Sequence, residues 1–236
     1  MHRRGSAEAL WCGGFLAGFE EVADMRNDKM AISMDVVICT MSDDELKVVV
    51  RKRDKAPFAG RFELPGVFLK ADESLKEGSR RCVRELTGLK SVYMEQMHTF
   101  GEVKRDSRER TISITYVAMI PESLLVDDYG ELAIDGAEFV SMTEMAGSKK
   151  MAFDHGKIIE KTLDFFAAKA VVSDIAFNLV DEEFTLPDLQ RAYELLLGKP
   201  LFKANFRNKM KNYIVETDYM TVGAAHRPSR LYTKIG

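Results

Sequence analysis

Short segments rich in β-branched residues alternate with two helical segments in the first two thirds of the chain. MDVVICTM and LKVVVRKR, joined by the turn SDDE, predict a β-hairpin that begins near Ser33. Further strands are predicted in SVYMEQMHTFGEV, RTISITYVAMIP and GAEFVSM. A charged segment that stops at Thr87-Gly88 predicts one helix, and DHGKIIEKTLDFFAAKA, with Asp154 as its cap, predicts another. Strands interleaved with two helices predict an α/β fold in which a sheet is covered on both faces.

The pattern changes at about residue 172, where helices are followed by a terminal hairpin. Thr185 and Asp188 predict a capping box that opens a helix through Leu196. A second helix is predicted from about Leu201 to Tyr213, and YIVET and RLYTKI are predicted strands. This order of elements is typical of a winged helix-turn-helix domain.

The first thirty residues have the outline of a signal peptide, because HRR precedes the apolar segment AEALWCGGFLAGF. Glu8 and the Gly13-Gly14 pair interrupt that apolar run, and no small-x-small cleavage site follows cleanly. We therefore predict a poorly ordered extension over residues 1–30, with Met25 or Met30 as alternative starts. No segment of the sequence is long enough to span a bilayer, so we expect no membrane partner.

Composition and charge place the chain among soluble globular proteins and suggest a polyanionic partner. Of its 236 residues, 46% are hydrophobic and 30% are charged, which excludes a disordered or fibrous chain. Three scattered cysteines (Cys12, Cys39 and Cys82) fit neither a disulfide framework nor a C-x-x-C metal site, so we expect a cytoplasmic protein. Residues 199–236 hold eight Lys/Arg and two acids, a local charge of +6, whereas the remainder holds 26 basic and 35 acidic residues. The C-terminal end therefore favours a polyanion.

The second C-terminal helix is predicted to have one buried side, formed by Phe202, Phe206 and Met210, and one basic side. A basic stripe alone is usually solvated surface, but a capped helix before it and a hairpin after it favour insertion into the major groove. The residues expected to contact DNA are Lys203, Ala204, Arg207, Asn208, Lys211, Arg227 and Arg230. Among these, Arg207 and Asn208 are the candidates for base edges, and the lysines and the other arginines for phosphates. The alternative is a module for protein interaction or dimerisation.

Residues 66–89, GVFLKADESLKEGSRRCVRELTGL, resemble the signature of the Nudix hydrolases, G-x5-E-x7-R-E-U-x-E-E-x-G-U, where U is aliphatic. Glu73, Arg81 and Glu85 fall on family positions, whereas Val67 replaces the first glycine. The resemblance implies an α/β/α sandwich with a mixed sheet. For Arg81 and Glu85 the alternative interpretation is a solvated or salt-bridged helix face.

The resemblance fails at the metal site. Nudix hydrolysis needs Mg²⁺, a hard cation that demands several oxygen ligands. Cys82 and Leu86 stand where two of the three clustered glutamates should be, on the same arc of the helix as Glu85. A thiol is a soft ligand and leucine supplies none, so we predict no catalytic residues, no metal and no required cofactor. The alternative is an active ADP-ribose pyrophosphatase with a basic accessory domain, which would need Mg²⁺.

A second constellation, TFGEVKRDSRERTISITY at residues 99–116, is similar to a stretch of Nudix proteins that handle ADP-ribose and of their regulatory relatives. Guanidinium groups bind phosphate oxygens in bidentate fashion, which suits a pyrophosphate ligand. The candidate ligand-binding residues are Arg53, Arg61, Arg105, Asp106, Arg108, Arg110 and Ser113. Without the resemblance, this stretch could equally be a charged hairpin turn with no ligand.

The segments FTLPDLQRAYELLLGKPLFKANFRNKM and HRPSRLY resemble the C-terminal domain of the Nudix-related transcriptional regulators, the NrtR family. With the degenerate Nudix box, this resemblance covers about residues 33–235. It implies a Nudix sensing domain over residues 31–172 and a winged helix domain over residues 173–236. It also implies a homodimer on a pseudo-palindromic DNA operator, which represses genes of NAD metabolism or sugar utilisation. ADP-ribose or a similar nucleotide or phosphosugar would release the DNA.

Overall fold

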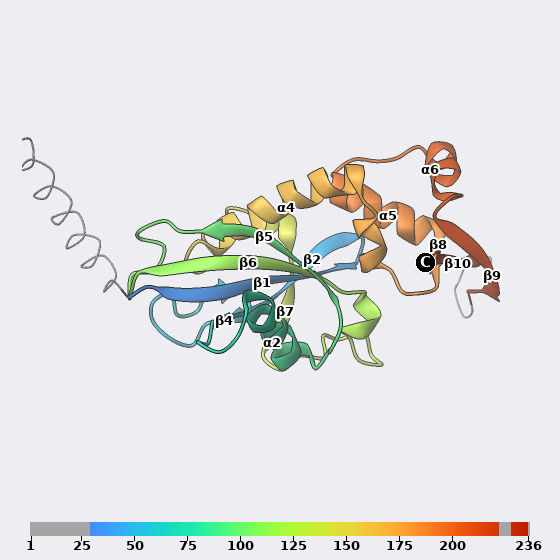
Figure 1. Ribbon diagram of the computed structural model, residues 1–236. Helices are drawn as coiled ribbons and strands as arrows, with labels where there is room; N and C mark the ends of the chain where they lie inside the picture. Colours follow the sequence, from blue (N-terminus) through green and yellow to red (C-terminus); the bar gives the residue numbers. More distant parts are fainter. Residues whose placement is uncertain (1–28, 222–227, 236) are drawn as a thin grey trace, which may run out of the picture.

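The protein is described by a computed structural model over residues 29–221 and 228–235. The predicted N-terminal extension, except for its last two residues, and the predicted DNA contact Arg227 lie outside the described residues. Within them, a sheet covered by helices is followed along the chain by a smaller helical unit with its own sheet (Figure 1). The sandwich followed by a winged helix was correctly predicted.

The predicted N-terminal hairpin forms the centre of the large sheet. Strand β1 (Ala31–Ser42) pairs antiparallel with β2 (Glu45–Lys52), and Ser42 lies opposite Glu45. The two turn residues, Asp43 and Asp44, both have positive φ angles, of 49° and 59°. Such two-residue turns match the twist of paired strands and favour aspartate, asparagine and glycine. The SDDE sequence therefore fixes the position of this turn.

The large sheet has seven strands and is mixed. Its main path runs in the order β3-β2-β1-β6-β5, with β4 paired to β1 and β7 paired to β2. Strand β6 runs parallel to β1, and the other pairs are antiparallel. The strands not yet bounded are β3 (Phe62–Glu63), β4 (Gly66–Phe68), β5 (Tyr93–Phe100), β6 (Thr111–Met119) and β7 (Ala137–Ser141).

Helices cover both faces of this sheet (Figure 1). Helix α2 (Leu75–Thr87) begins with a capping box between Ser74 and Glu77 and ends at Gly88, which has a φ of 75°. Its buried side meets one face of the sheet, and α4 (His155–Val172) meets the other. Short helical turns, η1 (Glu122–Leu124) and α3 (Met142–Met145), lie in the connections.

Asp154 occupies the N-cap position of α4, as predicted, but its side chain makes no hydrogen bond to the helix. Its two carboxylate oxygens instead accept hydrogen bonds from Arg105, at 3.0 and 2.8 Å. The predicted cap residue is therefore in place without a capping hydrogen bond, because a buried guanidinium is a stronger partner for its carboxylate than a helix N–H.

The C-terminal unit contains the predicted winged helix elements. Thr185 and Asp188 form the predicted capping box, and Gly198 ends the helix with a φ of 64°. The second helix is shorter than predicted, so Lys211 stands at its C-cap. The elements are η2 (Ile175–Leu179), β8 (Phe184–Thr185), α5 (Leu186–Leu197), α6 (Lys203–Met210), β9 (Ile214–Met220) and β10 (Arg230–Lys234). Strands β8, β10 and β9 form a separate sheet in that order.

The two units share one buried core. Phe166 and Ala170 on α4 belong to the same hydrophobic cluster as Leu189 on α5 and Phe206 on α6. Helix α4 therefore begins over the large sheet and ends against the winged helix unit. None of the helices in residues 29–221 and 228–235 has the length and apolar character needed to cross a membrane.

Candidate ligand pocket and DNA-binding surface

A cleft of about 360 Å³ lies at the end of the large sheet, beside helix α2. Its walls come from β1, β2, the chain around β3 and β4, helix α2, the loop between β5 and β6, and the start of α4. The lining residues are Ser33, Asp35, Arg51, Arg53, Glu63, Leu64, Pro65, Gly66, Val67, Phe68, Cys82, Glu85, Leu86, Arg105, Asp106, Arg108, Thr111, Phe153 and His155. Because charged side chains of both signs line it, the cleft suits a polar ligand.

Arg105 and two carboxylates form a charged cluster on one side of this cleft. The Arg105 side chain is only 4% exposed and lies 3.1 Å from Asp35 and 2.8 Å from Asp154. Burial disfavours its charge, but the hydrogen bond to Asp154 and the nearby carboxylates raise the pKa of Arg105 above its ordinary value. The buried hydroxyl of Ser113 also donates to Asp35. The guanidinium thus ties the loop before β6 to β1 and to the start of α4.

His155 completes this cluster in its neutral form. Its Nδ1 accepts a hydrogen bond from the backbone N–H of Leu64 at 2.9 Å, so its proton resides on Nε2. Burial lowers the pKa of His155, although the Asp35 and Asp154 charges oppose that shift. Glycine is required at position 66 next to Asp35, because a Cβ there would lie 2.6 Å from the Asp35 carboxylate. The Pro-Gly approach to helix α2 therefore makes room for this carboxylate.

Phe153 forms an aromatic wall between two arginines of the cleft. The Arg53 guanidinium lies 4.8 Å from the centre of its ring and the Arg108 guanidinium 5.3 Å. Phe153 has a φ of 50°, which is rare for a bulky residue. Arg53 also pairs with Glu63, and Arg108 pairs with Asp106 at 2.7 Å. The hydrogen bond with Arg108 is the main reason that the pKa of Asp106 is lowered.

The structure brings some of the predicted ligand-binding residues together and separates others. Arg53, Arg105, Asp106 and Arg108 line the cleft. The remaining three do not: Arg61 stacks on Phe58 at 5.1 Å, Arg110 donates to the carbonyls of Gly101 and Glu102, and Ser113 lies beneath the cleft.

Ser33 and Arg51 are among the lining residues that sequence reasoning missed. The Ser33 hydroxyl is buried and has no hydrogen-bond partner among the described residues. Arg51 follows Val49 at the spacing of one face of β2. That alternation could have indicated that Arg51 faces helix α2, as Val49 does.

The remnants of the Nudix box do not form a metal site in the described part of the chain. Glu73 accepts two hydrogen bonds from Arg81, at 2.9 and 2.6 Å, and these lower the pKa of Glu73 to about 2. Burial raises the pKa of the Cys82 thiol to about 12, so it remains protonated at neutral pH. No cluster of three acidic, histidine or cysteine ligands occurs within residues 29–221 and 228–235. The residues present therefore do not fit the Mg²⁺ of the hydrolases.

Helix α6 presents the second candidate surface. Phe206 and Met210 are buried, whereas all five predicted DNA contacts from Lys203 to Lys211 are exposed. No acidic side chain forms an ion pair with Lys203, Arg207 or Lys211 among the described residues. Lys209, which was not predicted, adds another exposed cation. Because these exposed cations form no ion pair in the described part of the chain, they are available to phosphates.

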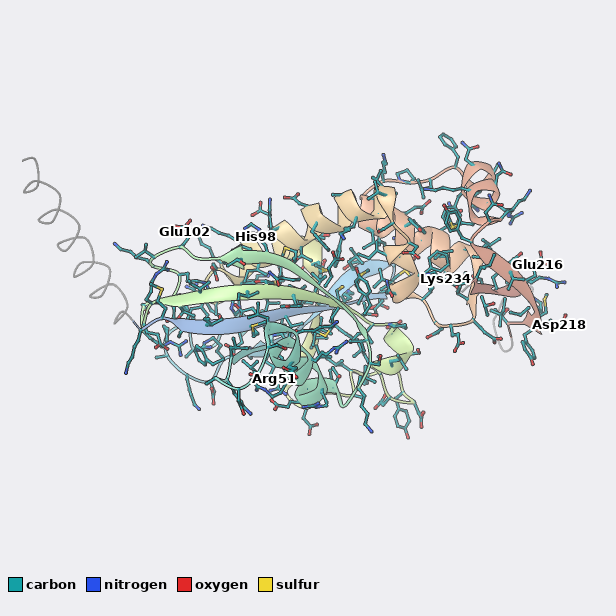
Figure 2. The ribbon with its side chains drawn as sticks, in the orientation of Figure 1. Arg51, His98, Glu102, Glu216, Asp218 and Lys234 are labelled. Atoms are coloured by element: carbon teal, nitrogen blue, oxygen red, sulfur yellow. The ribbon has the colours of Figure 1, made fainter. Side chains whose placement is uncertain are left out.

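The structure corrects the prediction for Phe202 and gives the predicted DNA contact Arg230 an acidic neighbour. Phe202 was expected on the buried side, but it precedes the shortened helix and is 83% exposed. Arg230 lies at the start of β10, where its guanidinium is 3.5 Å from the Glu216 carboxylate. Figure 2 shows Glu216 and Asp218 on strand β9, so this strand is acidic rather than basic.

Comparison with known proteins agrees with this two-part architecture. Residues 32–162 match the NUDIX domain family, and residues 176–233 match the NrtR DNA-binding winged helix domain. The chain is 29% identical over 222 residues to the ADPR responsive transcriptional repressor NtrR of Acinetobacter baylyi, which covers 92% of this chain and 86% of the relative. It is 29% identical over 138 residues to the ADP-ribose pyrophosphatase of Methanocaldococcus jannaschii, covering 58% of this chain and 78% of that enzyme.

Solved structures cover both units at once. The crystal structure of Shewanella oneidensis NrtR is 30% identical, with a TM-score of 0.75, covering 86% of this chain and 94% of that one. The same protein complexed with a 27mer DNA gives a TM-score of 0.76 at 29% identity, covering 86% of this chain and 93% of the other. Because these matches join a Nudix domain to this particular winged helix, the chain belongs to the NrtR family of Nudix-related regulators.

Proposed function

We propose that the protein is a transcriptional repressor that binds operator DNA through helix α6 and releases it when an effector occupies the cleft. The effector is ADP-ribose or a similar nucleotide or phosphosugar, and the regulated genes belong to NAD metabolism or sugar utilisation. The protein acts in the cytoplasm as a homodimer on a pseudo-palindromic operator. The observation that carries the proposal is the exposed basic helix α6 in a winged helix joined to a Nudix pocket, with no cluster of metal ligands among the described residues.

The geometry of α6 supports a role in reading base edges. At about 100° per residue, Ala204 and Asn208 stand opposite the buried pair Phe206 and Met210. An asparagine side chain can make a bidentate contact with adenine in the major groove. Arg207, the other candidate for base edges, lies between this outward face and the buried side, and Lys203 beside it can reach phosphates. The Shewanella relative, by its description, was crystallised with DNA.

The path from cleft to winged helix supports control by a ligand. Asp154 and His155 stand at the first turn of α4, and the last turns of the same helix share a core with α5. A ligand that changes the Arg105 cluster can therefore shift a helix that carries the winged helix. For release, the effector must bind more tightly to the dimer geometry that cannot span two half-sites. The Acinetobacter relative is described as responsive to ADPR.

The experiment measures binding to the DNA upstream of the protein's own gene by fluorescence anisotropy, at several salt concentrations. We expect Arg207→Ala and Lys211→Ala to weaken binding, and loss of each phosphate contact lowers the salt slope by about 1. Lys76→Ala on helix α2 removes the same charge from an exposed site in the other domain and serves as the matched control. ADP-ribose should release the wild-type protein. Unchanged binding of both α6 variants at low salt would favour a protein-interaction module.

One observation favours hydrolysis as a second candidate function. Glu85 lines the cleft with a side chain that is 57% exposed, and one relative is described as an ADP-ribose pyrophosphatase. The test is release of AMP from ADP-ribose in the presence of Mg²⁺ or Mn²⁺. A sensor gives no multiple turnover at ordinary enzyme rates, whereas an enzyme does and loses it in Glu85→Gln. Cys82→Ala is the control, because a buried protonated thiol contributes no metal ligand.

A further inference from the structure

The arc of helix α2 that would hold a metal in a hydrolase is almost neutral here. Cys82 and Leu86 line the cleft on this arc together with Glu85. The thiol is protonated and leucine carries no charge, so a single carboxylate remains on it. No metal ion would therefore balance the charge of a diphosphate placed over this arc. Binding of the diphosphate then needs positive charge from a side chain.

Arg51 is the cation that faces this arc. It lies near the end of β2 on the same face as Val49, whose side chain belongs to the core under α2. Figure 2 shows Arg51 beside helix α2. Arg51 lines the cleft with Cys82 and Glu85, and its charge is among those that act on the Cys82 thiol.

The other arginines of the cleft are already neutralised. Arg53 pairs with Glu63, Arg105 with Asp35 and Asp154, and Arg108 with Asp106. Arg51 has no carboxylate partner among the described residues, and its one hydrogen bond is a long contact of 3.5 Å to the carbonyl of Asp135. A ligand anion that contacts Arg51 therefore breaks no ion pair, whereas contact with the other three competes with a carboxylate.

We propose that Arg51 binds the diphosphate of the effector over the Cys82 and Leu86 arc, in the role that a divalent metal has in a hydrolase. The planar guanidinium offers two parallel N–H donors to phosphate oxygens and a permanent charge. It holds the diphosphate without supplying an activated water, so binding is separated from hydrolysis. This inference rests on the proposed function, because it assigns the effector to the class of diphosphates.

Isothermal titration calorimetry on the full chain tests it, with inorganic pyrophosphate and ADP-ribose as separate probes, in Mg²⁺ and in EDTA. For each probe, we expect the affinity of the wild-type protein to be the same in Mg²⁺ as in EDTA. Arg51→Gln should weaken both by about tenfold to hundredfold, the usual value of a hydrogen bond to a charged group. Arg51→Lys keeps the charge without the fork and should give an intermediate loss. Lys52→Ala, an exposed neighbour on the opposite face of β2, should change neither affinity.

The outcomes separate this inference from the proposed function. Binding of pyrophosphate but not ADP-ribose, with loss in Arg51→Gln, supports Arg51 and rejects ADP-ribose as the effector. Binding of either probe that requires Mg²⁺ overturns the role of Arg51, as does wild-type affinity in Arg51→Gln. Failure of the wild-type protein to bind either probe in EDTA also overturns it. Arg51 is exposed, so the variants should keep the thermal stability of the wild type, which a melting curve checks.

Discussion

Arg105 and Asp154 join the loop before β6 to the first turn of α4 through two hydrogen bonds, of 3.0 and 2.8 Å. The same guanidinium lies 3.1 Å from Asp35 on β1. Because α4 ends in the core that it shares with the winged helix unit, this one side chain connects the effector cleft with the DNA-binding end of the molecule. The pair is largely shielded from water, so we expect it to contribute to stability as well as to the proposed signalling.

Arg105→Leu should destabilise the protein strongly. It leaves the buried Asp35 and the largely buried Asp154 without their cation, and removal of one partner of a buried ion pair costs about 3–5 kcal/mol. Urea denaturation followed by circular dichroism measures the free energy of unfolding. The double variant Arg105→Leu with Asp154→Asn should recover part of the loss, because it removes one of the stranded charges. A loss below about 1 kcal/mol in the single variant would contradict a stabilising role for this buried pair.

Much of the fold could be predicted because local signals agreed with the final packing. The SDDE turn, the Thr185 capping box and the helix end at Thr87-Gly88 each predicted an element boundary that the structure contains. The end of the second C-terminal helix was less predictable. Lys211, Asn212 and Tyr213 are compatible with helix, and only the start of β9 at Ile214 ends it earlier. Phe202 also followed the apolar period, but the shortened helix left it exposed.

The site was harder to predict than the fold, because its contacts join residues distant in sequence. The 99–116 stretch pointed to Arg105, which lines the cleft. It could not show that Asp35 and Asp154, 70 and 49 residues away, would occupy that guanidinium. Arg110 carries the same charge and looks equivalent in the sequence, but its hydrogen bonds go to backbone carbonyls. Only the tertiary structure distinguishes Arg51, which has no carboxylate partner among the described residues, from an arginine in an ion pair.

Asp43→Asn should tighten DNA binding. Asp43 lines a hollow of about 490 Å³ together with Lys203 and Arg207, so its charge opposes phosphates that approach these cations. Asparagine tolerates the left-handed φ of this position, so the turn is retained. Removing one exposed like charge should raise affinity by up to about fivefold at low salt, and less at high salt.

Anisotropy titrations with the upstream DNA measure this gain, and Asp72→Asn, which removes an exposed charge before α2, is the control. Equal gains in both variants would assign the effect to net charge rather than to the hollow. No gain in Asp43→Asn would place the DNA away from this side of α6.

Stability should fall as the pH drops below about 6.5, the ordinary pKa of histidine. Burial lowers the pKa of His155 in the folded protein, so below that pH the unfolded chain binds a proton that the native state does not. The free energy of unfolding then decreases by up to about 1.4 kcal/mol per pH unit. Asp35, Asp154 and Glu63 favour the protonated ring and limit the effect, whereas Arg105 reinforces it.

Urea denaturation between pH 7.5 and 5.5 measures this slope. In His155→Gln, whose amide oxygen can still accept from the Leu64 N–H, the slope attributable to this residue should disappear. A wild-type stability that stays constant or rises as the pH falls over this range would refute the assignment.

Ser33→Ala should separate ligand binding from stability, because its hydroxyl is buried against the cleft without a partner in the described residues. An unsatisfied buried hydroxyl costs free energy, so its removal should leave the protein as stable as before or more stable, by up to about 3 kcal/mol. If a ligand hydroxyl or phosphate oxygen satisfies it, the same change should weaken effector binding by about twofold to tenfold.

Thr40 supplies a matched control for this prediction. Its hydroxyl is also buried and unpartnered among the described residues, but Thr40 does not line the cleft. Thr40→Val keeps the shape of the side chain and should reproduce the effect on stability while leaving effector affinity unchanged. Melting curves and calorimetric titrations of the two variants make the comparison. Equal effector affinities in both would show that the ligand leaves the Ser33 hydroxyl unsatisfied, since only a direct contact makes these two buried hydroxyls differ.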